Sequence, residues 1–330
     1  LVGTPVWDAV NEVTLNLDVN GDGDKADTDV RIVYLATSLG HIVKLIDSGS
    51  GLARPASGKW ASDFTSANVS TITSPLGNDG TNLYFGGTNG GATRVFGVQI
   101  AGGANEATLQ REVGAVGPVT TSPSIFTSSG STYVFLGSTA VSGHAYIYRV
   151  NMTNGTVDAS YAGSTTSING GVVLVSSGHA YAASDGGAVY ALDALNFGTG
   201  GFTDITGFPY QTAAAKPIKN APWVDYKTNN AYFGDDGGNV YGIDGAGAAL
   251  TGFPFSISGS IKITSTPIYL VNSGVIAIGA DDGYLYFIDR NNGSGPSVFK
   301  RFFVSNGGSV SSVSYNTNTS AYMVASSDGN

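Results

Sequence analysis

Short apolar runs separated by polar, glycine-containing segments recur along the chain. In residues 265–289, STPIYLVNSGVIAIGADDGYLYFID, apolar runs occupy 268–271, 275–279 and 284–288. Asp282-Gly283 separates the last two runs, and Asp-Gly between alternating apolar runs is a strong hairpin signal, since both residues tolerate the positive φ of a type I′ turn. The segment predicts three antiparallel strands, with a fourth at 299–304 before the next copy.

The same pattern occurs seven times. The positions that align with the proline of this segment are residues 5, 75, 123, 171, 222, 267 and 313, which lie 70, 48, 48, 51, 45 and 46 residues apart. A strand-built repeat of about 40 to 50 residues is typical of a β-propeller with one four-stranded blade per repeat. We therefore predict an all-β fold, a β-propeller of seven blades with four antiparallel strands each, forming a single domain over residues 1–330. The seventh copy reaches only its hairpin at 328–329, so we expect residues beyond this sequence to complete the last blade.

Composition narrows the function classes. Charged residues make up 12% of the chain and the formal net charge is −9, without a basic run that could neutralise phosphates, so a nucleic-acid role is excluded. The chain has no cysteine, which excludes disulfides and thiolate metal sites. The apolar runs are far shorter than the ~20 residues of a membrane span. Low charge with much glycine is typical of an all-β extracellular protein.

One insertion in the first repeat carries the clearest chemistry. Residues 18–29 read DVNGDGDKADTD and match the spacing of an EF-hand Ca²⁺ loop. Asp18, Asn20 and Asp22 stand at loop positions 1, 3 and 5, the carbonyl of Asp24 at position 7, and Asp29 at position 12. Alternate residues of a tightly turning loop point their oxygens inward, as Ca²⁺ requires. We predict one calcium site formed by these five residues.

Two features of the loop leave its chemistry open. Position 9 is Ala26, which has no side-chain oxygen, so a water molecule or the carboxylate of Asp27 would have to serve there. The alternative interpretation is a solvated acidic loop without an ion. Because the loop lies between predicted strands and not between helices, a bound ion would stabilise a blade and would not act as a sensor.

The calcium loop, the strand pair at 34–47 and the segment at 72–88 together resemble the C-terminal propeller of the PilY/PilC family of type IV pilus tip and adhesion proteins. The chain departs from that family at Ala26, where the family has a carboxylate, and at Val43, where it has an aromatic residue. The resemblance implies a calcium-binding, non-enzymatic module of a bacterial pilus or outer membrane, extracellular or on the cell surface. It also implies that pilus subunits, or a host or surface ligand, bind to loops at the propeller rim.

Two other function classes stay open. Residues 180–194, AYAASDGGAVYALDA, are similar to the repeats of pyrroloquinoline-quinone dehydrogenase propellers, which hold their cofactor at the ring centre and dock their blades with a tryptophan in most repeats. Only Trp7, Trp60 and Trp223 are present here, which argues against that enzyme, and Trp60 alone is a candidate docking residue. The other class is a scaffold for envelope assembly, whose propellers share every feature of this sequence except the calcium loop.

The remaining polar residues predict structural roles. His41, His144 and His179 fall in different repeats, so we expect ordinary hydrogen bonds and not a metal site. The aspartate pairs at 235–236 and 281–282 recur at the same hairpin and are assigned to turns. The repeated phrases TGFPY and TGFPF, at 206–210 and 251–255, are expected to pack their aromatic rings between blades.

The longest segments between predicted strands, 48–70 and 102–117, are the candidate binding loops, because loops on a repeated scaffold vary freely and carry recognition. The sequence predicts that deleting residues 51–63 abolishes partner binding without unfolding the propeller. A short helix is possible within 101–111.

Overall fold

The computed structural model describes residues 11–13, 31–47, 51–100, 104–114, 116–196, 201–257, 261–293, 295–316 and 321–328. The chain forms two compact units, Leu1–Gly163 and Ser164–Asn330. In the described residues the secondary structure is β apart from one 3-10 turn, η1, at Lys59–Ala61. Seven sheets follow one another along these described ranges, and we number them sheet 1 to sheet 7 in chain order.

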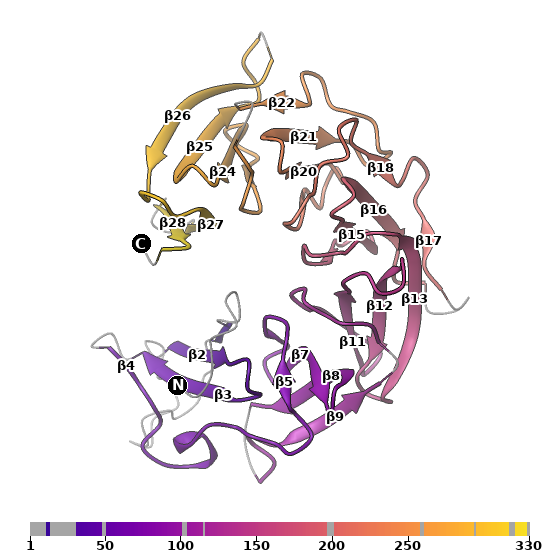
Figure 1. Ribbon diagram of the computed structural model, residues 1–330, viewed down its shortest axis with the longest axis vertical. Coiled ribbons are helices and arrows are strands. Elements are labelled where there is room, and N and C mark those ends of the chain that lie inside the picture. The colour runs from indigo at the N-terminus through magenta and orange to yellow at the C-terminus, as the bar shows by residue number, and fades with distance from the viewer. Residues whose placement is uncertain are drawn as a thin grey trace. The chain divides into compact units, whose positions relative to one another are not determined.

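The first unit holds sheets 1 to 3 (Figure 1). Their strand orders are β1-β2-β3-β4, then β5-β7-β8-β9 with β6 also pairing with β7, then β10-β11-β12-β13. Successive strands are antiparallel, as the registers of β2 with β3 and of β7 with β8 show. The bounds are β1 Asn11–Val13, β2 Arg31–Ala36, β3 Ile42–Asp47, β4 Leu52–Ala53, β5 Thr71–Ile72, β6 Gly77–Asn78, β7 Asn82–Asn89, β8 Ala92–Gln99, β9 Leu109–Val113, β10 Ser124–Ser128, β11 Ser131–Gly137, β12 Ala145–Asn151 and β13 Thr156–Ser164.

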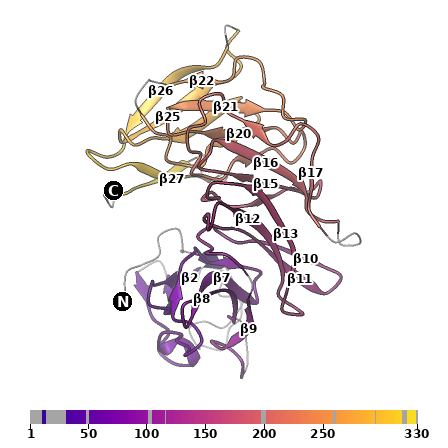
Figure 2. The same cartoon turned by 45° about the vertical axis from the view of Figure 1, so that its right-hand side comes forward.

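The second unit holds sheets 4 to 7, and Figure 2 shows neighbouring sheets of this unit stacked on one another. Their orders are β14-β15-β16-β17 with β18 also on β16, β19-β20-β21-β22, β23-β24-β25-β26, and β27-β28. The bounds are β14 Val173–Leu174, β15 His179–Ala183, β16 Ala188–Asp193, β17 Thr203–Asp204, β18 Tyr210–Gln211, β19 Trp223–Val224, β20 Ala231–Gly234, β21 Asn239–Ile243, β22 Phe255–Ser256, β23 Ile268–Leu270, β24 Val275–Gly279, β25 Tyr284–Asp289, β26 Ser297–Phe303, β27 Val310–Asn316 and β28 Ala321–Ser326.

Sheet 6 confirms the strands predicted from residues 265–304. The apolar runs form β23, β24 and β25 almost residue for residue, and β26 is the predicted fourth strand. The middle strands are buried on both faces, since Ile276, Ala277 and Ile278 are all fully buried. A continuous apolar run is therefore the expected pattern of these strands, because the sheet is covered on each side.

The type I′ turn predicted at Asp282-Gly283 is wrong in detail. Only Gly283 has a positive φ, +80°, and the amide of Ala280 donates to the carbonyl of Tyr284 (3.1 Å). This geometry is a type I turn followed by a left-handed glycine. The Asp282 carboxylate is used differently, because it accepts from the Tyr284 amide (3.2 Å) and the Tyr286 hydroxyl (2.5 Å). Two consecutive left-handed residues occur instead at Gly90-Gly91, between β7 and β8.

The residues that lead into a sheet bind two successive sheets. The amide of Ile263 donates to the carbonyl of Asp235 in sheet 5 (3.1 Å), while the carbonyl of Lys262 accepts from the amide of Asp281 in sheet 6 (3.0 Å). Residues 217–218 make the same two bonds one sheet earlier. The lead-in segments of sheets 5 and 6 therefore each tie one sheet to the next through main-chain atoms.

The small polar residue of the repeat has a buried structural role. Its hydroxyl accepts a hydrogen bond from the amide of a glycine in the following long strand. The pairs are Ser74 with Gly86 (2.8 Å), Thr121 with Gly137 (2.7 Å) and Ser265 with Gly279 (2.7 Å). The hydroxyl thus satisfies a main-chain donor in a place that water does not reach.

Aromatic rings fill the space between sheets, as the sequence predicts for the two repeated phrases. Phe208 packs edge-on against Tyr181, with ring centroids 5.9 Å apart, and belongs to a core shared by sheets 4 and 5. Phe253 packs against Tyr232 at 6.0 Å in a core shared by sheets 5 and 6. Both phenylalanines are buried, so these phrases are structural.

The structure corrects two expectations about long segments. Residues 51–70 are not a free binding loop, because they supply strand β4 and bury Trp60, which packs edge-on against Tyr34 with ring centroids 5.3 Å apart. Deleting residues 51–63 would remove part of the core, so the predicted tolerance to that deletion is wrong. Residues 109–111, which the sequence allows as a short helix, lie in strand β9. They form the fourth strand of sheet 2.

Candidate functional site

The predicted calcium ligands Asp18, Asn20, Asp22, Asp24 and Asp29 lie outside the described residues, as do Ala26 and Asp27. Among the residues that the structure does describe, no three His, Asp or Glu side chains are grouped to hold a metal ion. The calcium site therefore stays a prediction of the sequence.

The three histidines are in separate places. His41 follows the turn between β2 and β3 of sheet 1, and its Nδ1 lies 3.5 Å from the Asp63 carboxylate, which also pairs with the Arg54 guanidinium. His144 follows a hairpin turn in sheet 3, and His179 opens strand β15 of sheet 4. The structure brings no two of them together, and the His41 imidazole lies beside the Arg54–Asp63 ion pair of segment 51–70.

The aspartate pairs serve the hairpin turns, as predicted. Asp235 is fully buried, and its carboxylate accepts from the amides of Gly237 and Asn239 (both 2.9 Å) and from the Tyr241 hydroxyl (2.8 Å). Burial and this carboxylate raise the pKa of Tyr241. A carboxylate held by this many donors is a structural anchor of the turn.

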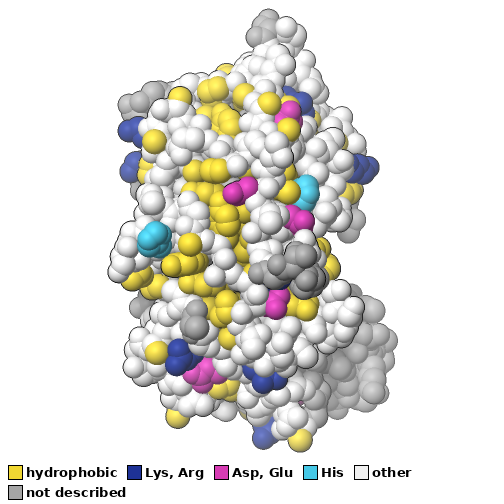
Figure 3. All heavy atoms as spheres, turned by 90° about the vertical axis from the view of Figure 1, so that its right-hand side faces the viewer, with side chains coloured by type: hydrophobic (Ala, Val, Ile, Leu, Met, Phe, Trp, Pro, Cys, Tyr) yellow, Lys and Arg dark blue, Asp and Glu magenta, His cyan; other side chains and the backbone are white. Residues whose placement is uncertain are grey.

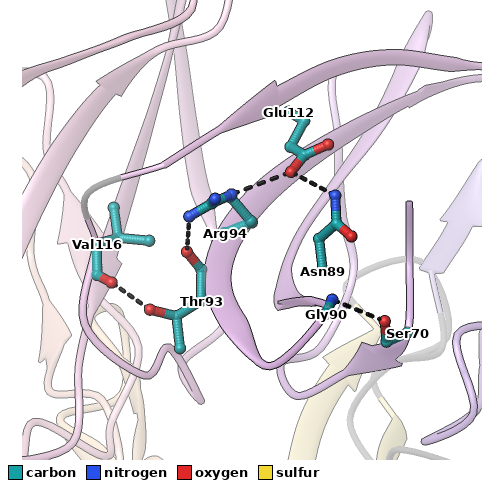
Figure 4. Close-up of polar contacts among 7 residues, drawn as sticks. All are labelled: Ser70, Asn89, Gly90, Thr93, Arg94, Glu112 and Val116. Atoms are coloured by element: carbon teal, nitrogen blue, oxygen red, sulfur yellow. Dashed lines mark hydrogen bonds and ion pairs between the residues drawn. The ribbon is translucent and has the colours of Figure 1, made fainter.

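A polar network joins three strands of sheet 2 (Figure 4). The Arg94 guanidinium pairs with the Glu112 carboxylate (3.0 Å), which also accepts from the Asn89 amide (2.9 Å). The Thr93 hydroxyl donates to the carbonyl of Val116. Each of these side-chain groups has a partner in the sheet or, for Thr93, in the segment that follows β9, so the network holds β7, β8 and β9 together and offers no free group for chemistry.

One lysine is buried between sheets 1 and 2. The Lys44 amine lies 3.4 Å from the Glu106 carboxylate, and Lys44 faces Tyr34 across the β2–β3 pair. Burial lowers the pKa of Lys44, and the nearby Glu106 carboxylate opposes that shift. Burial, assisted by Glu106, raises the pKa of Tyr34. The ion pair links the two sheets and leaves no free amine for a nucleophilic role.

Strand β26 carries the largest exposed aromatic surface among the described residues. Its sequence is SVFKRFF, and Phe299, Phe302 and Phe303 are 57%, 45% and 59% exposed. We call the exposed side chains of Phe299, Lys300, Arg301, Phe302 and Phe303 the β26 surface. The strand lies at the outer edge of sheet 6 (Figures 1 and 2).

The two faces of β26 differ in their neighbours. Phe303 and Arg301 lie on the face of Tyr284, with ring centroids of Phe303 and Tyr284 5.2 Å apart and the guanidinium 4.6 Å above Tyr284. Phe299 and Phe302 lie on the opposite face, where both rings contact Phe287 at 6.2 and 5.6 Å. The strand therefore presents aromatic rings on both sides.

The β26 surface combines exposed aromatic rings with basic residues, which is a composition common in protein-binding surfaces. Interface cores are enriched in aromatic residues and arginine, and an exposed apolar patch of this kind marks an interaction site. The Lys300 amine lies 4.4 Å above the Phe302 ring, so the apolar and charged parts are one continuous surface. The sequence predicted the strand but not its exposure; the run FKRFF was the available signal.

The face drawn in Figure 3 carries a band of hydrophobic side chains along its middle and few charged ones. On the face drawn in Figure 3, Lys and Arg side chains are scattered among polar and apolar residues and do not form a stripe. Within the described part of the chain, no helix has the length and apolar character needed to cross a membrane.

Comparisons with known proteins identify the architecture. No protein-family model and no curated protein matches the chain. In contrast, 1225 chains of solved structures match, so the architecture is widespread and does not select one function. One is the crystal structure of BamB from Moraxella catarrhalis, with a TM-score of 0.60 and 17% identity, covering 92% of this chain and 78% of that chain. The chain therefore has an all-β fold, that of a seven-bladed β-propeller whose blades are four-stranded antiparallel sheets.

Proposed function

We propose that this protein is a non-enzymatic propeller that binds partner proteins through the β26 surface. The observation that carries the proposal is the exposure of three phenylalanines beside Lys300 and Arg301 on one edge strand. The described polar clusters support it, because the groups of Asp235, Lys44 and Arg94 are already engaged within or between sheets.

We further propose that the partner belongs to a type IV pilus and that the protein acts in adhesion or pilus assembly at the bacterial surface. The support for this step is the sequence of the first two repeats, including the loop at 18–29. An envelope assembly scaffold is the second candidate, because it requires the same fold and the same exposed surface without the calcium loop.

The binding proposal is tested by co-sedimentation of the purified chain with isolated type IV pili. We expect saturable binding that falls at least tenfold in Phe302→Ser and in Phe299→Ser. The matched control is Leu52→Ser, which removes an exposed apolar side chain, 58% exposed, from strand β4 of sheet 1. Absence of binding to pili would refute the pilus assignment, and equal losses in all three variants would refute the role of the β26 surface.

The calcium part of the proposal has its own test. Titration calorimetry should show one Ca²⁺ bound with a dissociation constant of about 10⁻⁵ to 10⁻³ M, since an aspartate at position 12 reaches less far than the usual glutamate. Asp22→Ala should abolish this binding. Asp24→Ala should retain it, because that position contributes a main-chain carbonyl. No heat at millimolar Ca²⁺, or equal stabilisation by Mg²⁺, would show that the loop is only a solvated acidic segment.

A further inference from the structure

Strand β13 is the longest edge strand among the described residues. It is the last strand of sheet 3 and has nine residues, whereas the other edge strands of the described sheets have seven or fewer (Figure 1). No described strand pairs with its outer side. The described range 116–196 runs without a break through β13 and well past it, so this edge does not lie beside a chain end. An edge of this length presents a row of main-chain donors and acceptors to another strand.

This edge also lacks the side chains that usually prevent strand pairing. Proteins protect long edge strands with lysine, proline or bulges. Strand β26, for example, carries Lys300 and Arg301. Strand β13 reads TVDASYAGS and has no lysine, arginine or proline. Its one charged group, the Asp158 carboxylate, lies 2.8 Å from Nε of the buried Arg149 on β12, so this charge is compensated within the sheet.

The sequence of β13 is complementary to itself in antiparallel pairing. In a pair with β13 of a second copy, centred on Ser160, each residue of 157–163 stands opposite a residue of the same range. The opposed pairs are Val157 with Gly163, Asp158 with Ala162, Ala159 with Tyr161, and Ser160 with itself. Outside the central pair, a larger side chain thus faces a smaller one. The two Asp158 side chains do not face each other, because they are four positions apart along the strands, roughly 14 Å at about 3.4 Å per residue.

The Tyr161 ring is placed to serve such a pair. It lies over Gly163 of its own strand, since a Cβ on Gly163 would collide with the ring. In the pair, Val157 of the second copy stands opposite Gly163 and therefore beside that ring. Val157 packs at the border of the core shared by sheets 2 and 3. Pairing would join the apolar borders of the two copies on one face of the extended sheet, and cross-strand contacts of this kind stabilise sheets.

We propose that two copies of this chain associate by antiparallel pairing of β13, which joins their two four-stranded sheets 3 into one. The two-fold axis passes between the two Ser160 residues, perpendicular to the sheet, and such an axis closes the assembly as a dimer. The contact is one strand pair, at the low end of interface sizes, so we expect a weak and reversible dimer. It involves none of the residues of the β26 surface.

The chain has no cysteine, so a single introduced thiol tests the register directly. Opposed residues of antiparallel strands have Cβ atoms about 4.5–5.5 Å apart, close enough for a disulfide after a small shift. Ser160→Cys in the full chain, at millimolar concentration under mild oxidation, should form a disulfide-linked dimer. Ala162→Cys is the matched control, because it is also exposed on the same face but its two thiols stay roughly 14 Å apart. We expect at least tenfold faster cross-linking of the first variant.

Charge at the centre of the pair gives a second measurement. Sedimentation equilibrium should show self-association weakened at least tenfold in Ser160→Lys, because like charges then face each other. An equimolar mixture of Ser160→Lys and Ser160→Asp should associate again, because opposite charges meet. Gln110→Lys is the control, since it adds the same charge at an exposed position of β9, the last strand of sheet 2, and should change association less than twofold.

A chain that stays monomeric at millimolar concentration would overturn the proposal, as would equal cross-linking of the two cysteine variants. Equal weakening by Ser160→Lys and Gln110→Lys would place the contact on another surface and overturn it too. Hydrogen exchange adds a check on the free edge, because amides of β13 should exchange more slowly as the protein concentration rises. Exchange that is as slow at micromolar as at millimolar concentration would show that another part of the chain covers the edge, and the proposal would fail.

Discussion

At the residue scale, the small polar and glycine positions of the repeat are tightly constrained by hydrogen bonding and by space. The hydroxyls of Ser74, Thr121 and Ser265 accept bonds from main-chain amides, and each of these residues is at most 1% exposed. Two of the glycines that donate these bonds, Gly86 and Gly279, sit where the next sheet approaches. A Cβ on Gly279 would lie 2.4 Å from Cγ1 of Val310. Polar and small residues thus appear in the repeat for steric and hydrogen-bonding reasons.

Ser265→Ala should destabilise the fold by about 1–3 kcal/mol, because the buried amide of Gly279 loses its acceptor. Chemical denaturation followed by circular dichroism measures the change. The control is Ser160→Ala in strand β13, where the side chain is exposed and the expected change is within about 0.5 kcal/mol. Equal effects of the two substitutions would contradict the assigned role of the hydroxyl.

Gly279→Ala should also destabilise the protein, by about 1–3 kcal/mol, since the added methyl overlaps both the side chain and the carbonyl of Val310. Gly293→Ala is the matched control, because no atom lies within 4 Å of its added Cβ. The melting temperature should fall for the first variant and stay unchanged for the second. A stable Gly279→Ala protein would mean that the lead-in segment of sheet 7 can move aside.

At the element scale, the repeat pattern gives strands reliably but assigns the segments between them poorly. The hairpin between β24 and β25 follows the predicted position with a different turn type. Residues 51–70 resemble a loop because they are rich in polar and small residues, yet they include β4, η1 and the buried Trp60. A single tryptophan in such a segment is enough to make it part of the core.

Trp60→Ala should therefore cost about 3–5 kcal/mol of stability, the usual cost of removing a fully buried large aromatic side chain. Leu52→Ala, at an exposed position of the neighbouring strand, should change stability by less than about 0.5 kcal/mol. Urea unfolding distinguishes the two. If both variants were equally stable, residues 51–63 would be dispensable after all.

At the scale of the whole molecule, buried tyrosines are the dominant titrating groups. Burial raises the pKa of nine tyrosines distributed over both units: Tyr34, Tyr84, Tyr148, Tyr181, Tyr210, Tyr232, Tyr241, Tyr286 and Tyr322. For Tyr181 and Tyr286 the pKa is raised to about 12. The packing between sheets thus depends on neutral phenols.

We expect stability to fall steeply as the pH rises above about 10. An unfolded tyrosine loses its proton near pH 10, whereas the folded one keeps it, so the unfolded state binds fewer protons and is favoured. Below the unfolded pKa these groups add no pH dependence. Among the described residues, Lys44, whose pKa is lowered, acts in the opposite direction, whereas Lys219, whose pKa is raised beside Asp236, acts in the same direction as the nine tyrosines.

Guanidinium unfolding between pH 8 and pH 11.5 measures this decline. Tyr181→Phe should flatten it, because it removes one titrating group without removing the ring that packs against Phe208. Stability that stays constant up to pH 11.5 would contradict the assignment of the tyrosines as the alkaline-sensitive groups.

The sequence by itself determined where most of the long strands lie, because strand positions depend on local information, but it did not determine the register at the 282–283 hairpin. The length and alternation of apolar runs indicate the strands, and Gly or Asp-Gly indicates the turns between them. Both signals are local, because they involve residues only a few positions apart in the sequence. The positions of β24 and β25 and the packing of Phe208 and Phe253 were accordingly predictable. The calcium ligands are also a sequence prediction, at residues outside those described.

Only the tertiary structure decided which apolar residues are covered. Phe287 and Phe302 belong to neighbouring strands of the same sheet face, yet Tyr322 of the next sheet lies over the first and leaves the second half exposed. Trp60 is buried for the same kind of reason, because Tyr34 lies beside it. Burial depends on neighbours distant in sequence, so a repeat pattern that specifies each strand cannot show which strand face another sheet will cover.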